Sequence, residues 1–244
     1  MLDKELCSRN ISGAKASARG PAVTHVMYAD NIVLFSKTTK NDAEILTKCL
    51  DRYRDWSGQS INRSKFGIVF SKHTCSSSRR AIKHQFQMRN LKKEAIYLGA
   101  PLFLSRSPSK DFKFLQEKLE VKLSGWRSCC LSWVGRCTLI NSVAQALPNY
   151  TLSSFNIPKK ICDKLDSLTR RFRWKPKEKE GRFLAWKAWD VLCRPKCAGS
   201  LNFKKTREMN SALLAKLPWM VCLGERCICM DLLRAKYKVS NDWL

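Results

Sequence analysis

The chain has 244 residues, of which 44% are hydrophobic and 10% aromatic, so it can bury a sizeable core and is not disordered over its whole length. It carries 46 Lys and Arg residues against 20 Asp and Glu residues, a formal net charge of +26. A folded protein with so large a positive charge favours a polyanionic partner, and we expect RNA or DNA.

Membrane and secretory segments are not expected. No run approaches the roughly 18 to 20 apolar residues of a transmembrane helix, and no apolar signal segment follows Met1. The 12 cysteines are therefore interpreted as reduced thiols of an intracellular protein. Zinc is not expected, because the spacings in 193–197 and 222–229 fit no common zinc finger.

The first third of the chain predicts an α+β domain. Residues 23–35 consist of two β-branched and aromatic runs that meet at Asp30, which favours a β-hairpin with a carboxylate at its tip. Asn41, with Glu44 three residues later, predicts the start of a helix that ends at Gly58. Further elements are expected after it: a strand over 66–70, a polar loop over 74–80 and an extended segment over 96–102.

Helical periodicity dominates the rest of the chain. Apolar spacing predicts one helix through 112–123, stopped near Gly125, and another through 139–147, stopped by Pro148. A third helix opens at Pro158 and runs to Phe172. We expect a linker over 175–181, a short helix over 186–192, and a last helix from 206 that Pro218 kinks or ends.

Tyr28-Ala29-Asp30-Asn31 resembles the Tyr-Ala-Asp-Asp box of reverse transcriptases. Further stretches agree in the same order, namely Ser57-Gly58-Gln59-Ser60-Ile61-Asn62 with Lys65, Tyr97-Leu98-Gly99, Leu123-Ser124-Gly125-Trp126, Gly135-Arg136 and Cys193-Arg194-Pro195-Lys196. The ordered series is similar to plant LINE-type (non-LTR) retroelement proteins, from the polymerase palm onward. This resemblance covers about residues 10 to 221.

The resemblance implies two-metal phosphoryl transfer with Mg²⁺. Asp30 would be the metal ligand at the hairpin tip, and Asn31 stands where the family has a second Asp. Lys65 would lie near the triphosphate, and Tyr97, Leu98 and Gly99 would belong to the primer grip. Alternatives remain open: Asp30 as an ordinary turn residue, Lys65 as a solvated lysine, and 97–99 as core packing with a turn.

The helix from Pro158 is the strongest candidate for nucleic-acid binding outside the hairpin. Its cations would contact phosphates, and Trp174 would stack on an unpaired base. A solvated basic face is the equally weighted alternative. The candidate residues are Lys159, Lys160, Lys164, Arg170, Arg171, Arg173 and Trp174.

These observations predict a partial reverse-transcriptase palm over 1–103, a helical thumb over 104–157 and a basic, Trp-rich helical extension over 158–244. In the family, the other essential Asp lies on an earlier palm strand and the fingers lie earlier still. This sequence shows neither, and Asn31 replaces the second Asp of the box, so we expect the chain not to polymerise DNA alone. Primer–template RNA and DNA are the expected partners, with no small-molecule cofactor, and the family's way of life suggests the nucleus. The alternatives are a non-catalytic RNA- or DNA-binding protein and an unselected retroelement remnant.

Overall fold

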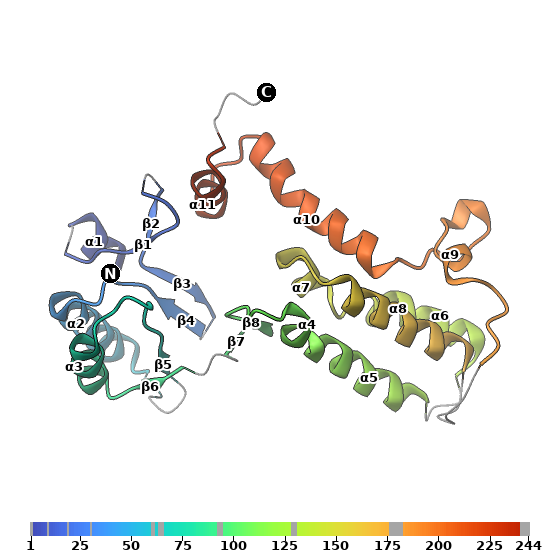
Figure 1. Ribbon diagram of the computed structural model, residues 1–244, viewed down its shortest axis with the longest axis horizontal. Coiled ribbons are helices and arrows are strands. Elements are labelled where there is room, and N and C mark those ends of the chain that lie inside the picture. Colours follow the sequence, from blue (N-terminus) through green and yellow to red (C-terminus); the bar gives the residue numbers. More distant parts are fainter. Residues whose placement is uncertain are drawn as a thin grey trace. The chain divides into compact units, whose positions relative to one another are not determined.

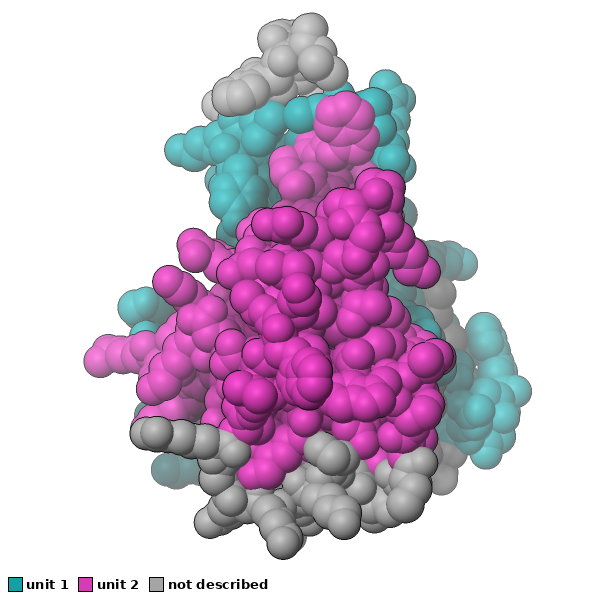
Figure 2. Space-filling view, turned by 90° about the vertical axis from the view of Figure 1, so that its right-hand side faces the viewer, with its two compact units in different colours: residues 1–98, 221–244 teal, residues 99–220 magenta. Residues whose placement is uncertain are grey.

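The computed structural model describes residues 2–8, 10–18, 20–29, 31–59, 62, 66–91, 95–127, 131–175 and 183–239. The chain forms two compact units, Met1–Leu98 with Val221–Leu244 and Gly99–Met220 (Figure 2). Helices predominate in both, and the described strands form only two-stranded sheets (Figure 1). The fold is therefore α+β with a large excess of helix.

The first unit combines short strands with a few helices. In chain order its elements are α1 (Leu2–Cys7), β1 (Ala14–Lys15), β2 (Ala22–Val23), β3 (His25–Tyr28), β4 (Asn31–Leu34), α2 (Lys40–Ser57), β5 (Gly67–Ile68), α3 (Ser76–Phe86), β6 (Arg89–Asn90), β7 (Ile96–Tyr97) and α11 (Ile228–Tyr237). Strands β1 and β2 pair antiparallel, β5 and β6 pair parallel, and α2 packs against α3.

The predicted hairpin is confirmed. Strands β3 and β4 pair antiparallel in a register that runs from His25 opposite Leu34 to Tyr28 opposite Asn31. The side chains of Val26, Met27 and Tyr28 are 45%, 53% and 65% exposed. The described strands of this α+β unit do not assemble into one common sheet. Each is only two to four residues long and pairs with a single neighbour.

Helix α2 confirms the helix predicted before Gly58 but begins earlier than expected. Its N-cap is Thr39, not Asn41: the Thr39 hydroxyl oxygen accepts a hydrogen bond from the Asp42 backbone N–H at 3.2 Å. The same hydroxyl donates to the Asp42 carboxylate at 2.6 Å, so the Thr39 side chain both accepts from and donates to Asp42. Gly58 ends the helix with φ +68°, as predicted.

Helix α3 corrects the expectation of a polar loop over 74–80. Its first turn contains three serines, which are weak helix formers. The Cys75 sulfur caps the helix by accepting a hydrogen bond from the Ser78 backbone N–H, and Ile82 is buried one turn later. The cap and this single core contact outweigh the poor propensity of the serines.

The second unit is almost entirely helical. Its elements are β8 (Ala100–Pro101), α4 (Pro108–Asp111), α5 (Lys113–Arg127), α6 (Trp133–Leu139), η1 (Ile140–Ala144), α7 (Asn149–Ser154), α8 (Lys159–Trp174), α9 (Trp189–Leu192), η2 (Lys196–Ala198) and α10 (Thr206–Cys222), whose last two residues fall in the first unit. Helices α5 and α8 lie along each other, and the core contains buried residues of both, including Leu115, Leu119, Leu165 and Phe172 (Figure 1).

Pro148 lies between two helical segments, as the sequence suggested, whereas Pro218 does not end its helix. The α6 path passes through η1, a π-type turn in which the Gln145 N–H donates to the Ile140 carbonyl, and Pro148 then caps α7. Helix α10 runs through Pro218 to Cys222. A proline removes only one backbone donor, so flanking turns with their own hydrogen bonds carry the helical path onward.

Other expectations have mixed outcomes. Helix α5 passes Gly125, and the helix predicted to be last is followed by α11. The short helix predicted over 186–192 covers only α9, and Trp186 precedes it with 75% of its side chain exposed. The proposed linker lies outside the described residues from 176 onward.

The division into palm, thumb and extension remains a prediction. Within the second unit, residues of the expected thumb and of the expected extension share one hydrophobic core. No helix in the described part of the chain is both long and apolar enough to cross a membrane.

Candidate nucleic-acid interface

The hairpin tip places Asn31 at the start of β4, where its side chain is exposed. Ala29 in the turn has φ +52°, a left-handed conformation found in tight hairpin turns. Asp30 and Lys65 both lie outside the described residues. The roles that the resemblance implies for these two side chains therefore remain predictions.

Magnesium would need several carboxylates at this tip. The described residues supply there the amide oxygen of Asn31, a weak ligand without charge. Elsewhere in the described ranges, no three His, Cys, Asp or Glu side chains form a group that could hold a metal ion. The described part of the tip does not fit a two-magnesium centre.

The segment Tyr97-Leu98-Gly99 forms a tight turn. Leu98 and Gly99 have φ values of +51° and +80°, and left-handed backbone at two successive residues is typical of a type I′ hairpin turn. Leucine is rare in this conformation, so the turn is locally strained. The Tyr97 hydroxyl is buried without a hydrogen-bond partner among the described residues. The geometry agrees with a hairpin, while the primer-grip role remains a prediction.

Helix α8 separates its apolar and basic residues. Ile161, Leu165, Leu168 and Phe172 recur at helical spacing and are buried in the core of the second unit. Outside this apolar stripe, four cations are exposed and form no ion pair within the described ranges: Lys159, Lys160, Lys164 and Arg170. We call these four residues the α8 basic face. Because they are exposed and form no ion pair in these ranges, they are available to phosphates.

The remaining predicted residues at the end of α8 lie elsewhere. Arg171 is half-buried, and Arg173 and Trp174 pack against Trp133 of α6. The Trp174 and Trp133 ring centres are 5.6 Å apart in an edge-to-face arrangement. Trp174 is thus part of an aromatic contact, whereas the sequence suggested a free stacking platform.

Two residues of this region were missed by the sequence reasoning, Trp133 and Arg136. The guanidinium carbon of Arg136 lies 5.6 Å from the centre of the Trp133 ring, and that of Arg173 lies 4.6 Å from it. Burial and the nearby charge of Arg173 lower the pKa of the Arg136 guanidinium. The signal in the sequence was the Gly135-Arg136 stretch, whose position opposite the end of α8 only the packing reveals.

An acidic groove borders the α8 basic face. It has a volume of about 280 Å³ and is lined by Asp163, Asp166, Ser167, Arg170, Trp189, Asp190 and Lys205. Lys205 binds Asp190 at 2.6 Å, and this hydrogen bond lowers the pKa of Asp190. Burial raises the pKa of Asp166, although its carboxylate accepts hydrogen bonds from the backbone N–H and the hydroxyl of Thr206. Asp163 and Asp166 have no cation partner in the described ion pairs and repel phosphate, so Arg170 lies at the limit of the basic surface on this side.

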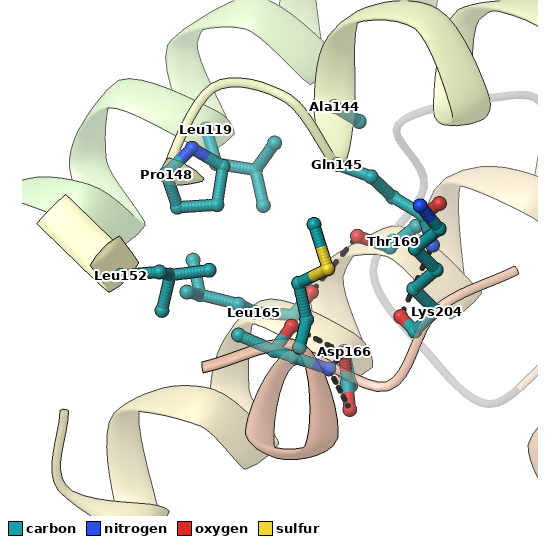
Figure 3. A pocket seen from close by; sticks show the side chains of 11 residues that line it. Leu119, Ala144, Gln145, Pro148, Leu152, Leu165, Asp166, Thr169 and Lys204 are labelled. Atoms are coloured by element: carbon teal, nitrogen blue, oxygen red, sulfur yellow. Dashed lines mark hydrogen bonds between the residues drawn. The ribbon is translucent and has the colours of Figure 1, made fainter. Parts of the chain in front are cut away.

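A second, smaller pocket is structural. It lies between Leu119, Leu152 and Leu165, and Figure 3 shows Gln145 and Asp166 at its polar side. The Gln145 amide donates to the Lys204 carbonyl at 3.1 Å. The cavity of about 20 Å³ accommodates no more than a water molecule, so it is a packing gap beside the start of α10.

The cysteines of the described ranges do not form a shared metal site, and burial sets the thiol pKa of several of them. Ten described cysteines are free thiols. Burial raises the pKa of Cys162 to about 11 and that of Cys193 to about 12, so both are inert near neutral pH. Hydrogen bonds with Ser77 and then Ser78 lower the pKa of the exposed Cys75 thiol to about 7.

The chain is similar to two plant proteins, although no protein-family model matches it. It is 31% identical over 142 residues to the Arabidopsis thaliana protein named "Putative ribonuclease H protein At1g65750". The aligned region covers 58% of this chain and 23% of that protein. It is 37% identical over 93 residues to the "Uncharacterized mitochondrial protein AtMg00310" of the same plant. This aligned region covers 38% of this chain and 60% of that protein. The chain is therefore a distant relative of plant proteins and spans less than two thirds of each.

Proposed function

We propose that the chain is a nucleic-acid-binding piece of a plant LINE-type reverse transcriptase and that the α8 basic face is its main contact with RNA or DNA. The ordered motifs around Asp30, Lys65 and Tyr97 support this origin. The similarity to a plant protein named for ribonuclease H, an enzyme of RNA, is consistent with it. In this proposal β3 and β4 belong to the palm, α4 to α7 to the thumb, and α8 onward to the basic extension.

The observation that carries the proposal is the unneutralised charge on one helix face. The described ion pairs of the second unit involve Lys113 and Lys205 and leave the α8 basic face untouched. In a chain of net charge +26, these cations add to a field that attracts polyanions from every side. Phosphate contacts of this kind give affinity without sequence preference.

Salt dependence is the direct test. The full chain is titrated with an RNA template carrying a DNA primer at several NaCl concentrations, and the slope of log Kobs against log salt counts the phosphates contacted. Replacing the four cations of the α8 basic face by Gln should flatten that slope by up to about 3.6, since each phosphate contact contributes about 0.9. The variant is K159Q/K160Q/K164Q/R170Q.

A matched control removes the same charge from the other unit, on and just before α2. It carries K37Q/K40Q/K48Q/R52Q, again three lysines and one arginine, all exposed. Equal losses in the two variants would show that binding depends on net charge alone and would contradict the assignment to α8. Absence of any salt-dependent binding, together with aggregation, would favour an unselected remnant. Primer extension with Mg²⁺ and nucleotides in the same preparation would overturn the expectation of a non-polymerising chain.

A further inference from the structure

Four side chains at one end of the second unit form what we call the arginine–tryptophan cluster: Trp133 and Arg136 of α6, and Arg173 and Trp174 of α8. Helices α6 and α8 pack against each other, which brings the two pairs together. Both guanidinium groups lie against the Trp133 ring, and Arg173 also lies 5.2 Å from the centre of the Trp174 ring. The cluster thus concentrates two positive charges on one aromatic surface.

Hydrogen-bonding capacity in the cluster is left unused. Arg136 is only 8% exposed, and its Nη2 donates to the Leu131 carbonyl at 3.2 Å. Four further donors are buried and have no partner among the described residues: Nη1 of Arg136, Nε and Nη1 of Arg173, and Nε1 of Trp174. Neither arginine forms an ion pair in the described ranges. In folded proteins the large majority of buried donors have a hydrogen-bond partner, so four unpaired donors in one place require an explanation.

Stability does not provide that explanation. Two like charges held at one ring repel each other, and burial removes the water that would compensate them. Contacts with the tryptophans offset part of this cost through cation–π attraction. An anion stabilises an arrangement of this kind, in which two cations lie close together and several of their N–H donors are unpaired.

The chemistry of the donors indicates which anion. Arginine side chains present planar forks that match the oxygens of phosphate. Trp133 remains 49% exposed, so part of its ring is open to a flat apolar group beside the anion. A phosphate next to an unpaired base supplies both.

We propose that the arginine–tryptophan cluster binds one phosphate group of a single-stranded nucleic acid and that the adjoining base stacks on Trp133. This inference rests on the proposed function and adds a discrete site to it. The α8 basic face is exposed and binds through many screened charges, whereas the cluster is largely buried and saturates with a single phosphate. Its contribution is therefore much less sensitive to salt.

Binding is tested on the full chain with three probes: inorganic phosphate, a short oligothymidylate with a 5′-phosphate, and the same oligonucleotide with a 5′-hydroxyl. Inorganic phosphate should raise the unfolding temperature above that in NaCl of equal ionic strength. Tighter binding of the 5′-phosphorylated oligonucleotide would identify a terminal phosphate as the ligand. Equal binding of both oligonucleotides would identify an internal phosphodiester.

The decisive variants replace each arginine by methionine, of similar length but without charge. Arg136→Met and Arg173→Met should weaken oligonucleotide binding at high salt by about 10- to 100-fold, because hydrogen bonds to a charged group are lost. Both should leave the unfolding temperature unchanged or higher, since an unpaired buried charge is removed. Trp133→Leu should weaken oligonucleotide binding but retain the response to inorganic phosphate.

A structural role gives the opposite pattern. If an acid of the chain itself neutralised the arginines, the methionine variants would unfold at lower temperature, and so would Glu178→Gln with Glu180→Gln; that result would overturn the inference. Failure of the inference is distinguishable from failure of the proposed function. In the first case the phosphate response is absent while duplex binding still depends on the α8 basic face, and in the second case duplex binding is itself absent.

Discussion

Asn210 illustrates how a single polar side chain joins distant segments of the second unit. It is 3% exposed, and its amide group donates to the Leu152 carbonyl at 2.6 Å and to the Phe155 carbonyl at 2.8 Å. Its side-chain oxygen accepts from the Ile157 N–H at 3.0 Å. These three bonds attach α10 to the end of α7 and to the connection between α7 and α8. They thereby support α8, the helix that carries the basic face.

Truncating this side chain should destabilise the second unit. Asn210→Ala leaves two carbonyls and one N–H of the connection without their partner, at a cost of about 3 kcal/mol. Urea unfolding followed by the near-UV signal of the tryptophans measures the change. Asn156→Ala, in the same connection but exposed, is the matched control and should change stability by less than about 0.5 kcal/mol. Equal effects of the two changes would contradict the role given to Asn210.

Helix α2 shows what an element gains from its first turn. The Thr39 hydroxyl accepts from the Asp42 backbone N–H and donates to the Asp42 carboxylate. That carboxylate also accepts from the backbone N–H groups of Ser12 and Lys37 at 3.2 and 3.3 Å. Asp42 is only 6% exposed, so these bonds satisfy a buried carboxylate. The cap therefore anchors the helix start to two loops of the first unit.

Removing the capping hydroxyl should loosen α2 from its N-terminus. Thr39→Ala should cost about 1 kcal/mol, so the amides of the first two turns should exchange with deuterium about fivefold faster. Thr38→Ala serves as the control, because Thr38 is exposed and adjacent but is not the cap. Faster exchange in both variants, or in neither, would show that Thr39 is not the effective cap.

At the scale of the whole molecule, charge repulsion is the dominant electrostatic effect. The described ion pairs are largely exposed, and most join residues three or four positions apart, such as Lys40 with Glu44 and Lys113 with Glu117. Such pairs contribute little. They do not balance a net charge of +26, which opposes the compact state.

Salt should therefore stabilise the protein. Raising NaCl from about 0.05 to 0.5 M screens the repulsion and should increase the unfolding temperature by about 3 °C. The measurement is calorimetry at pH 7, with each transition analysed separately because the chain has two units. A lower unfolding temperature at high salt would mean that ion pairs outweigh the repulsion.

Sequence patterns predicted the elements with strong local signals. The β-branched runs around Ala29 predicted the hairpin, and the spacing from Ile161 to Phe172 predicted α8 and its basic face. Weak local signals misled: the serines after Cys75 suggested a loop, and Pro218 suggested a kink or an end in a helix that continues to Cys222. At Cys75 the cap outweighed the propensity of the serines.

The sequence by itself determined the charge, the helical periodicity and the motif order, because these depend only on residue types and their spacing. Only the tertiary structure decided which side chains meet. Trp133 and Arg136 lie nearly 40 positions before Arg173, and no local pattern links them. The packing of α6 on α8 buries donors of Arg136, Arg173 and Trp174 that have no partner among the described residues, and burial of this kind is a property of the folded chain alone.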